Sequence, residues 1–273
     1  MQTREQLVAH FEIERELADK LKISTRETRR TLYKEVYDEL FRRVPHHPQL
    51  TERDSWQARA SRAARQVRFL LSIAASNPVF LEVGPGDCLT SLEMARRADR
   101  VYAVDVSEEI TSKIEPPENF HLLLSDGCSI ALPPGSVDLV FSNQLMEHLH
   151  PEDALVQLQN IYRILKPSGK YLCITPNRFS GPHDVSQHFG DVARGLHLRE
   201  YALRELLPLF RSAGFSKFHV YIGKDGRYIR VPIALCKSME AVMDALPRAV
   251  RKKIGKFAPC RLLLGIRLLA LKC

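Results

Sequence analysis

Six short apolar runs, separated by helical or loop segments, constrain the fold of this chain more than any other feature. The runs cover residues 79–83, 101–104, 120–124, 137–141, 170–174 and 217–222. They are nearly continuous rather than alternating in polarity, which is typical of parallel strands that are covered on both faces. The alternation of such strands with helices predicts a doubly wound α/β fold with a mostly parallel sheet.

Helical periodicity marks several segments between and after these strands. Helices are predicted over 152–166 and over about 200–213. Residues 233–256 are predicted to be a helical insertion before a last strand. The connection 176–198 has no periodicity, and long connections inside compact domains are usually functional, so we expect it to be a substrate loop.

The part of the chain before the first strand is predicted to be helical. We expect residues 1–75 to form a lid over a substrate and residues 76–273 to form the α/β domain. Aromatic and apolar residues recur at helical spacing over 31–43, where Tyr33 and Tyr37 are candidates for substrate contact. Such a stripe also occurs on helices that face a core, so a packing role for both tyrosines stays open.

Positive charge is concentrated at the C-terminal end. The chain has 40 Lys and Arg against 32 Asp and Glu, which is a net charge of +8. Residues 245–273 hold eight basic residues and no acidic one, so the other 32 basic residues balance the 32 acidic ones. This patch can attract phosphate, anionic lipid or nucleic acid, or it can be an ordinary solvated surface.

The last apolar stretch, 262–272, has two interpretations. As a helix it would be amphipathic and basic and would lie on a membrane surface. As a strand it would close the sheet, and Gly265 favours this because glycine costs a helix interior about 1 kcal/mol. We expect the strand, and peripheral membrane contact through the basic C-terminus stays open.

Composition excludes several classes of protein. The chain is 45% hydrophobic and 26% charged, as in an ordinary globular protein and unlike a disordered or collagen-like chain. No apolar run approaches the roughly 20 residues that cross a bilayer. The charged N-terminus lacks the apolar core of a signal peptide, so a cytoplasmic location is expected.

Glycine and polar residues follow the ends of the first four strands. The first strand runs through Glu82 into the turn Gly84-Pro85-Gly86, where glycine lets the backbone approach a ligand closely. The later strands end in Asp105, in Ser125-Asp126-Gly127 and in Ser142-Asn143. The carboxyl ends of parallel strands meet at one edge of the sheet, where open α/β folds bind ligands, and an acid at 105 suits ribose hydroxyls.

These segments together resemble the class I S-adenosylmethionine-dependent methyltransferases of the type-11 small-molecule group, and are similar to ubiquinone-type O-methyltransferases. The matching segments are LEVGPG (81–86), AVD (103–105), SDG (125–127), LPPGSVDLVFSNQLMEHL (132–149), LKPSGKYLCITPN (165–177) and HLREYALRELLPLFRSAGF (197–215). The resemblance implies a Rossmann-like, seven-stranded sheet whose last strand is inserted antiparallel beside the sixth. A dinucleotide-binding turn fits less well, because it needs a third glycine where the chain has Asp87-Cys88-Leu89.

The resemblance also implies S-adenosyl-L-methionine as the cofactor and places it at the strand ends. Gly84 and Gly86, with Pro85 between them, would bracket its carboxypropyl and ribose parts, and Asp105 would accept the ribose hydroxyls. The other implied contacts are Glu82 near the amino group, Val106 against adenine, Asp126 and Gly127 at the adenine amino group, and Asn143 near the amino end. Each position can also be an ordinary turn or strand-end residue.

Four histidines lie after the fourth strand or in and beside the long connection. A hydroxyl acceptor loses a proton during methyl transfer, and histidine suits that task near neutral pH, so His148 and His183 are the candidate catalytic residues. His188 and His197 are candidate substrate contacts. Each of the four can instead be structural, as a loop hydrogen bond or a helix cap. His183 and His188 do not complete a ligand set, and no metal is expected.

The sequence therefore predicts an enzyme that transfers methyl from S-adenosyl-L-methionine to a small-molecule acceptor, by O-methylation. The [DNS]PP[YFW] motif of methyltransferases that act on base amino groups is absent, with residues 142–145 (SNQL) in its place, which argues against nucleic acid as a partner. Two alternatives stay open. One is an RNA- or membrane-associated binding protein that uses the basic C-terminus, and the other is a catalytically inactive cofactor-binding domain.

Overall fold

Eight strands form one sheet in the computed structural model of the chain, which describes residues 3–48, 50–51, 55–107 and 115–273. The strand order is β3-β2-β1-β4-β5-β8-β6-β7, and β1 to β5 pair in parallel. The strands are β1 (Val79–Val83), β2 (Arg100–Asp105), β3 (Phe120–Leu124), β4 (Val137–Asn143), β5 (Leu165–Thr175), β6 (Lys217–Lys224), β7 (Arg227–Val231) and β8 (Ile266–Leu271). The predicted mostly parallel α/β sheet is confirmed.

The C-terminal segment is the inserted antiparallel strand that was expected. β8 lies between β5 and β6 and pairs antiparallel with both, so that Leu268 stands opposite Cys173 on one side and Val220 on the other. Helix α9 (Ala258–Leu264) precedes it and ends at Gly265. The stretch 262–272 is therefore helical only over its first three residues and then enters the sheet.

The predicted strand number of seven is wrong by one, because β6 and β7 form a hairpin. Asp225 and Gly226 both have positive φ, 54° and 81°, as the turn of a two-residue hairpin requires. β7 is an edge strand with the sequence RYIRV, in which Arg227 and Arg230 are exposed. Charged residues interrupt its apolar pattern, and an edge strand tolerates them because one of its sides meets solvent.

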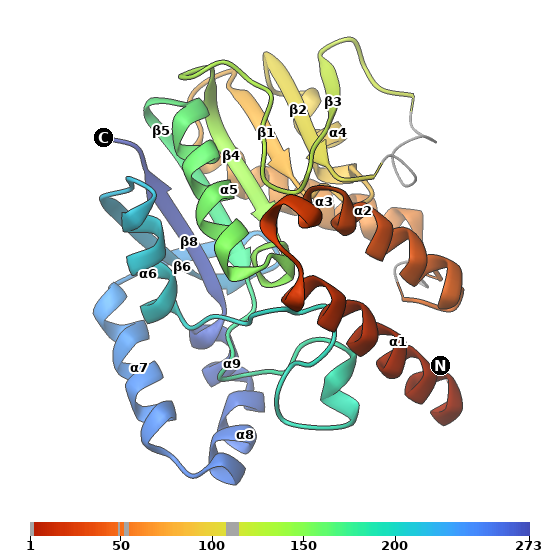
Figure 1. The fold of residues 1–273 in the computed structure, drawn as a ribbon. Coiled ribbons are helices and arrows are strands. Elements are labelled where there is room, and N and C mark those ends of the chain that lie inside the picture. Colours follow the sequence, from red (N-terminus) through yellow and green to blue (C-terminus); the bar gives the residue numbers. More distant parts are fainter. Residues whose placement is uncertain (1–2, 49, 52–54, 108–114) are drawn as a thin grey trace.

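Helices cover both faces of the sheet (Figure 1). Successive strand residues point to opposite faces, so Leu81 and Val83 belong to one core and Phe80 to the other. The first core is shared with α1 (Arg4–Ile23), α2 (Arg26–Arg43), α5 (Pro151–Ile164) and α6 (Leu203–Ser212), and the second with α3 (Trp56–Ile73) and α4 (Leu89–Ala95). The predicted insertion before the last strand consists of α7 (Ile233–Ala245) and α8 (Arg248–Lys256), followed by α9.

The N-terminal helices occupy two different places. Helix α3 packs behind the sheet through Val67, Leu70 and Ile73, as part of the second core. Helix α2 instead crosses the carboxyl ends of the parallel strands, where its Tyr33 ring lies against Gly127. Of residues 1–75, α2 thus lies beside the carboxyl ends of the strands, whereas α3 is part of the α/β layers.

A buried ion pair fastens α2 to α5. The Arg29 side chain is 1% exposed, and its Nε lies 2.6 Å from Asp153 Oδ2. Its Nη2 lies 2.6 Å from Glu152 Oε2. The Tyr33 hydroxyl donates to Asp153 Oδ2 at 2.8 Å and accepts from the His150 N–H at 2.9 Å. Two turns of α2 are therefore tied to the first turn of α5.

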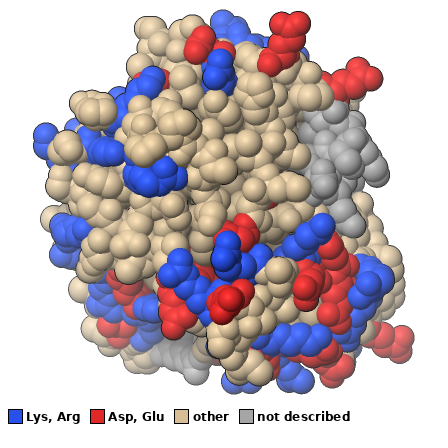
Figure 2. Space-filling view, turned by 45° about the horizontal axis from the view of Figure 1, so that its top comes forward, with Lys and Arg blue, Asp and Glu red and all other residues tan. Residues whose placement is uncertain are grey.

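Several of the C-terminal cations have partners within the fold. Arg251 Nη2 donates to the carbonyl of Leu246, Lys252 pairs with Asp191, and Lys272 Nζ donates to the carbonyl of Leu165 at 2.8 Å. Figure 2 shows Lys and Arg interspersed with Asp and Glu over the lower half of the face it presents. Among the described residues, no helix is both long and apolar enough to span a bilayer.

Candidate functional site

The turn after β1 has the backbone conformation that glycine allows. Gly84 and Gly86 have φ of 68° and 54°. A Cβ on Gly84 would lie 2.9 Å from the Leu145 side chain, whereas a Cβ on Gly86 would project into open space. The Gly84 N–H donates to the Val104 carbonyl at 2.8 Å and so joins the turn to β2. Both glycines are needed because the backbone has positive φ at these two positions, and the missing side chain of Gly86 also leaves room beside the backbone.

Asp105 lies at the end of β2 and faces this turn. Its Oδ1 accepts from the Val106 N–H at 2.7 Å, and its carboxylate also accepts from the Gly86 N–H. Burial raises the pKa of Asp105, and these backbone donors offset part of the shift. The carboxylate is thus fixed in place by backbone donors next to the glycine turn.

A cavity opens at the carboxyl ends of β1, β2, β3 and β4, and we call it the strand-edge cavity. Eight residues that the sequence singled out line it: Gly84, Gly86, Asp105, Val106, Gly127, Tyr33, Tyr37 and His148. Other lining residues were not predicted, among them Ser107, Ser125, Gln144, Leu145 and Gln157. They come from turns after the strands and from α5, and only the folded chain brings them to one place.

Four of the predicted cofactor residues do not line this cavity. Glu82 is buried beneath the turn and accepts from the Ser91 hydroxyl, and burial raises its pKa to about 8. Pro85 is buried in the turn, and Asn143 is exposed at the end of β4. Asp126 accepts from the Ser129 N–H at 2.7 Å, and its Oδ2 accepts from Arg30 Nε at 2.9 Å.

A second cavity, of about 320 Å³, adjoins the first and is lined by six of the ten histidines. We call it the histidine cavity. Its histidines are His10, His47, His148, His183, His188 and His197, and its carboxylates are Glu14 and Asp184. It shares three wall residues with the strand-edge cavity: Tyr37, Gln144 and His148. The structure thus brings all four predicted histidines to a single cavity beside the glycine turn.

His148 stands where the two cavities meet, and its tautomer follows from its partner. Its Nδ1 lies 3.0 Å from the Leu196 carbonyl oxygen, which can only accept, so Nδ1 carries the proton. Nε2 is therefore a proton acceptor when the ring is neutral. Burial, followed by the nearby His197, lowers the pKa of His148 to about 3, so that the ring is neutral at physiological pH.

Two neighbours of His148 are also buried and titratable. Burial raises the pKa of Glu147 to about 7, and its Oε2 accepts from the Thr175 hydroxyl at 2.9 Å. The rings of His148 and His197 meet edge to face, with centroids 4.8 Å apart. Burial works against a charge on His197, but its Nδ1 lies 2.8 Å from Glu200 Oε1, and the net effect raises the pKa of His197.

The other predicted residues lie at the margin of the histidine cavity or have structural partners. His183 and His188 are exposed, and His183 Nε2 lies 3.3 Å from the Asn177 carbonyl oxygen. The hydroxyl of Tyr33 is engaged by α5, as described above. Tyr37 lines both cavities, its ring centroid is 6.2 Å from that of His148, and burial raises the pKa of its hydroxyl.

Three residues of the histidine cavity escaped sequence reasoning: His10, Glu14 and His47. His10 and Glu14 are four residues apart and therefore lie on one face of α1, and His47 belongs to the connection after α2. Burial raises the pKa of Glu14, but hydrogen bonds from His10, His47 and the Leu196 N–H outweigh it and lower that pKa to about 2. The spacing on α1 was the available signal, but nothing local indicates that His47 folds back onto it.

Comparison with known proteins adds family information to this geometry. Residues 81–173 match the family described as methyltransferase domain. A probable S-adenosylmethionine-dependent methyltransferase of Mycolicibacterium smegmatis is 30% identical over 139 residues, which cover 50% of this chain and 51% of that protein. Another, of Mycobacterium tuberculosis, is 30% identical over 138 residues, covering 50% of this chain and 47% of that protein. The chain spans about half the length of the curated relatives it matches.

Solved structures share the fold. Phosphoethanolamine N-methyltransferase 1 of Haemonchus contortus, in complex with phosphoethanolamine and S-adenosylhomocysteine, has a TM-score of 0.55 at 18% identity and covers 91% of this chain and 50% of that chain. A SAM-dependent methyltransferase of Thermotoga maritima, described as a possible histamine N-methyltransferase, has a TM-score of 0.51 at 15% identity and covers 97% of this chain and 100% of that chain. At these identities the likeness concerns the fold alone.

Proposed function

This chain carries a class I S-adenosylmethionine-dependent methyltransferase domain, as its motifs predicted, and we propose that it transfers methyl to a small-molecule acceptor held in the histidine cavity. The observation that carries this proposal is the shared wall between two cavities. The strand-edge cavity suits the cofactor, and among the described residues only Tyr37, Gln144 and His148 belong to both cavities. A donor in one cavity and an acceptor in the other would meet at that wall.

The residues of the strand-edge cavity fit S-adenosyl-L-methionine. Gly86 leaves open space beside the backbone, and Asp105 presents a fixed carboxylate that can accept two ribose hydroxyls. Val106 offers an apolar surface to an adenine ring, beside Ser125 and Gly127. When bound, the cofactor supplies an electrophilic methyl group on a sulfonium. Glu82 does not line this cavity, so we assign it the role of supporting the turn from below rather than that of contacting the cofactor.

His148 is our candidate for the base, and this favours a hydroxyl acceptor. A hydroxyl must lose its proton when its oxygen takes a methyl group, and the neutral His148 ring offers Nε2 as the acceptor, which is a weak base as long as burial holds its pKa near 3. The Leu196 carbonyl holds the ring in this tautomer. Tyr37 and Gln144 complete the wall. His183 and His188, at the exposed margin, are our candidates for acceptor contact.

Replacement of Asp105 tests the cofactor site. We expect Asp105→Ala to weaken binding of S-adenosyl-L-methionine by about 1–3 kcal/mol, because the ribose hydroxyls would lose their acceptor. Asp99→Ala is the matched control, because this exposed aspartate lies just before β2, at the far end of that strand, and its replacement should leave binding unchanged. Isothermal titration calorimetry measures both. Equal affinity of the wild type and Asp105→Ala would contradict the assignment.

Replacement of His148 tests the transfer step. We expect His148→Ala to lower the rate of methyl transfer by about 10²- to 10⁴-fold while S-adenosyl-L-methionine still binds. His121→Ala, an exposed histidine on β3, is the control. The assay follows tritiated methyl from the cofactor into fractionated metabolites, lipids and RNA of the source cell. Label in the metabolite fraction supports the proposal. Label only in RNA, or cofactor binding with no transfer to any fraction, would contradict it.

A further inference from the structure

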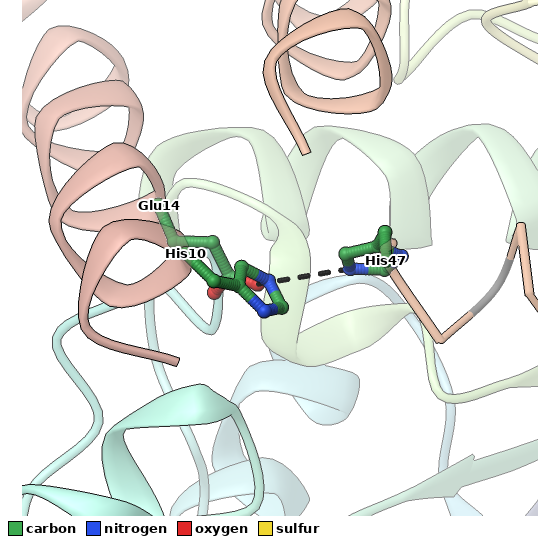
Figure 3. Close-up of side chains that lie close together, drawn as sticks. All are labelled: His10, Glu14 and His47. Carbon is green, nitrogen blue, oxygen red and sulfur yellow. Dashed lines mark hydrogen bonds and ion pairs between the residues drawn. The ribbon is translucent and has the colours of Figure 1, made fainter. Parts of the chain in front are cut away.

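The further site lies at the wall of the histidine cavity that faces away from the glycine turn. Figure 3 shows His10 and Glu14 on α1 with His47 opposite them. Glu14 Oε1 lies 2.8 Å from His10 Nε2 and 3.8 Å from His47 Nε2. The exposed fractions of the three residues are 3%, 6% and 9%. Two imidazole nitrogens and one carboxylate oxygen thus converge on a single buried point.

The spacing of these donor atoms matches a metal site. One ligand atom from each residue lies within 4.8 Å of the others. Zinc binds imidazole nitrogen and carboxylate oxygen at about 2.0–2.2 Å, so ligand atoms on neighbouring corners of a tetrahedron are roughly 3.3 Å apart. The distances from Glu14 Oε1 to the two histidine nitrogens, 2.8 and 3.8 Å, fall on either side of that value. Small side-chain rotations would let all three atoms bind one ion.

A second contact orients the carboxylate. Glu14 Oε2 accepts from the Leu196 N–H at 3.1 Å, which leaves Oε1 as the oxygen turned toward both histidines. Outer hydrogen bonds of this kind hold metal ligands in position in many sites. The Leu196 carbonyl in turn accepts from His148, so one backbone residue connects this cluster with the wall where the cavities meet.

The charge of the cavity also calls for a cation. Glu14 and Asp184 line it, and no Lys or Arg is found among its described lining residues. Asp184 accepts hydrogen bonds from the backbone N–H groups of Ser186 and Gly195. These donors stabilise its negative charge but do not cancel it. Buried carboxylates are costly unless they are paired or coordinate a metal. Glu14 accepts hydrogen bonds from His10, His47 and the Leu196 N–H in the metal-free chain, and a divalent cation would take the place of the two imidazole donors.

We propose that His10, Glu14 and His47 bind one divalent transition-metal ion, with Zn²⁺ best matched to the donors, and that its remaining coordination position faces the histidine cavity. Two histidines and one glutamate with an open fourth position are a known set for catalytic zinc. No metal was expected from the sequence, because His183 and His188 do not complete a ligand set and the ligands proposed here come from two segments more than 30 residues apart. If the proposed function holds, the open position would bind an oxygen of the acceptor and orient it toward His148. The metal site itself does not depend on that function.

The test is metal binding by the untagged full chain, without cofactor or acceptor. After treatment with chelator, the protein is titrated with Co²⁺, whose visible absorption reports tetrahedral coordination, and with Zn²⁺ by calorimetry. We expect one ion per chain and a higher melting temperature with Zn²⁺, because the ion binds the folded state. His10→Ala, His47→Ala and Glu14→Gln should each weaken Zn²⁺ binding by on the order of 100-fold or more.

Two controls separate this site from its neighbours. His188→Ala removes an exposed histidine of the same cavity and should leave Zn²⁺ affinity unchanged. His197→Ala examines the neighbouring group of Glu147, His148 and His197, which also places three ligand atoms within 4.8 Å. If His197→Ala abolishes binding while His10→Ala and His47→Ala do not, the assignment is wrong.

The remaining outcomes are also decisive. A wild-type chain that binds no Zn²⁺ or Co²⁺ overturns the proposal and leaves a hydrogen-bonded cluster. Circular dichroism of each metal-free variant shows whether it folds. His47→Ala should disturb α1 least, because His47 lies in a connection and not in a helix. Calorimetry with S-adenosyl-L-methionine is carried out on the same samples. A wild-type chain that binds the cofactor but no metal therefore counts against the metal site alone, whereas a variant that loses metal binding and keeps cofactor binding supports it.

Discussion

Arg29→Ala is expected to lower the free energy of unfolding by about 3–5 kcal/mol, because it leaves the buried Asp153 carboxylate without its cation. Asp153 is 1% exposed, and Arg29 Nε is its charged partner at 2.6 Å. The Tyr33 hydroxyl donates to the same oxygen, so the contact between α2 and α5 would lose its centre. Urea denaturation followed by circular dichroism measures the effect.

The neighbouring arginine supplies the control. Arg30 also pairs with an aspartate, Asp126, at 2.9 Å, but its side chain is 66% exposed. Exposed pairs contribute about 0–1 kcal/mol, so Arg30→Ala should change stability little. Hydrogen exchange of α2 amides should rise in Arg29→Ala and not in Arg30→Ala. If both variants are as stable as the wild type, α2 is not held by Arg29 and the lid needs another explanation.

Removal of residues 266–273 is expected to abolish cooperative folding. β8 is a central strand, and Ile266, Leu268, Leu269 and Ala270 are each at most 2% exposed. Without it, β5 and β6 would both present unpaired edges. Large buried side chains each contribute about 1.5–3 kcal/mol, and the total exceeds what a domain that is stable by about 5–15 kcal/mol can lose.

A graded substitution gives a measurable form of the same prediction. Leu268→Ala should cost about 2–5 kcal/mol, because the side chain is fully buried between β5 and β6. Leu262→Ala, in α9 where the side chain is 37% exposed, should cost much less. A truncated chain with an unchanged melting temperature that no longer sediments with anionic liposomes would contradict the fold and support a membrane-bound tail.

The residues on the cofactor side of the site could largely be predicted from the sequence. A glycine turn after a buried strand and an acid at the end of the next strand are local patterns, and parallel strands bring their carboxyl ends to one edge. Gly84, Gly86, Asp105, Val106 and Gly127 accordingly line one cavity. Asp126 shows where prediction from local patterns fails. It also follows the end of a strand, but its carboxylate accepts from the Ser129 N–H and from Arg30, which is 96 residues away in sequence, and it does not line the cavity.

By itself, the sequence determined the order of strands and helices and the place of the glycine turn, because hydrophobic periodicity and turn residues act over short distances. It also favoured a strand for the last segment, because Gly265 interrupts a helix and the apolar run after it is short, although residues 262–264 belong to α9. It missed β7, whose arginines hide the strand pattern at an exposed edge. These features depend on neighbours within a few residues along the chain.

Only the tertiary structure decided what surrounds the site. Arg29 meets Asp153 across 124 residues, and Glu14 meets Leu196 across 182. Contacts of this length depend on how α1 and α2 dock on the sheet, and no local pattern encodes that docking. The same docking gathers six histidines from four segments into one cavity. The histidines are therefore brought together by the tertiary structure, because the free energy that places them side by side comes from packing and ion pairs elsewhere in the molecule.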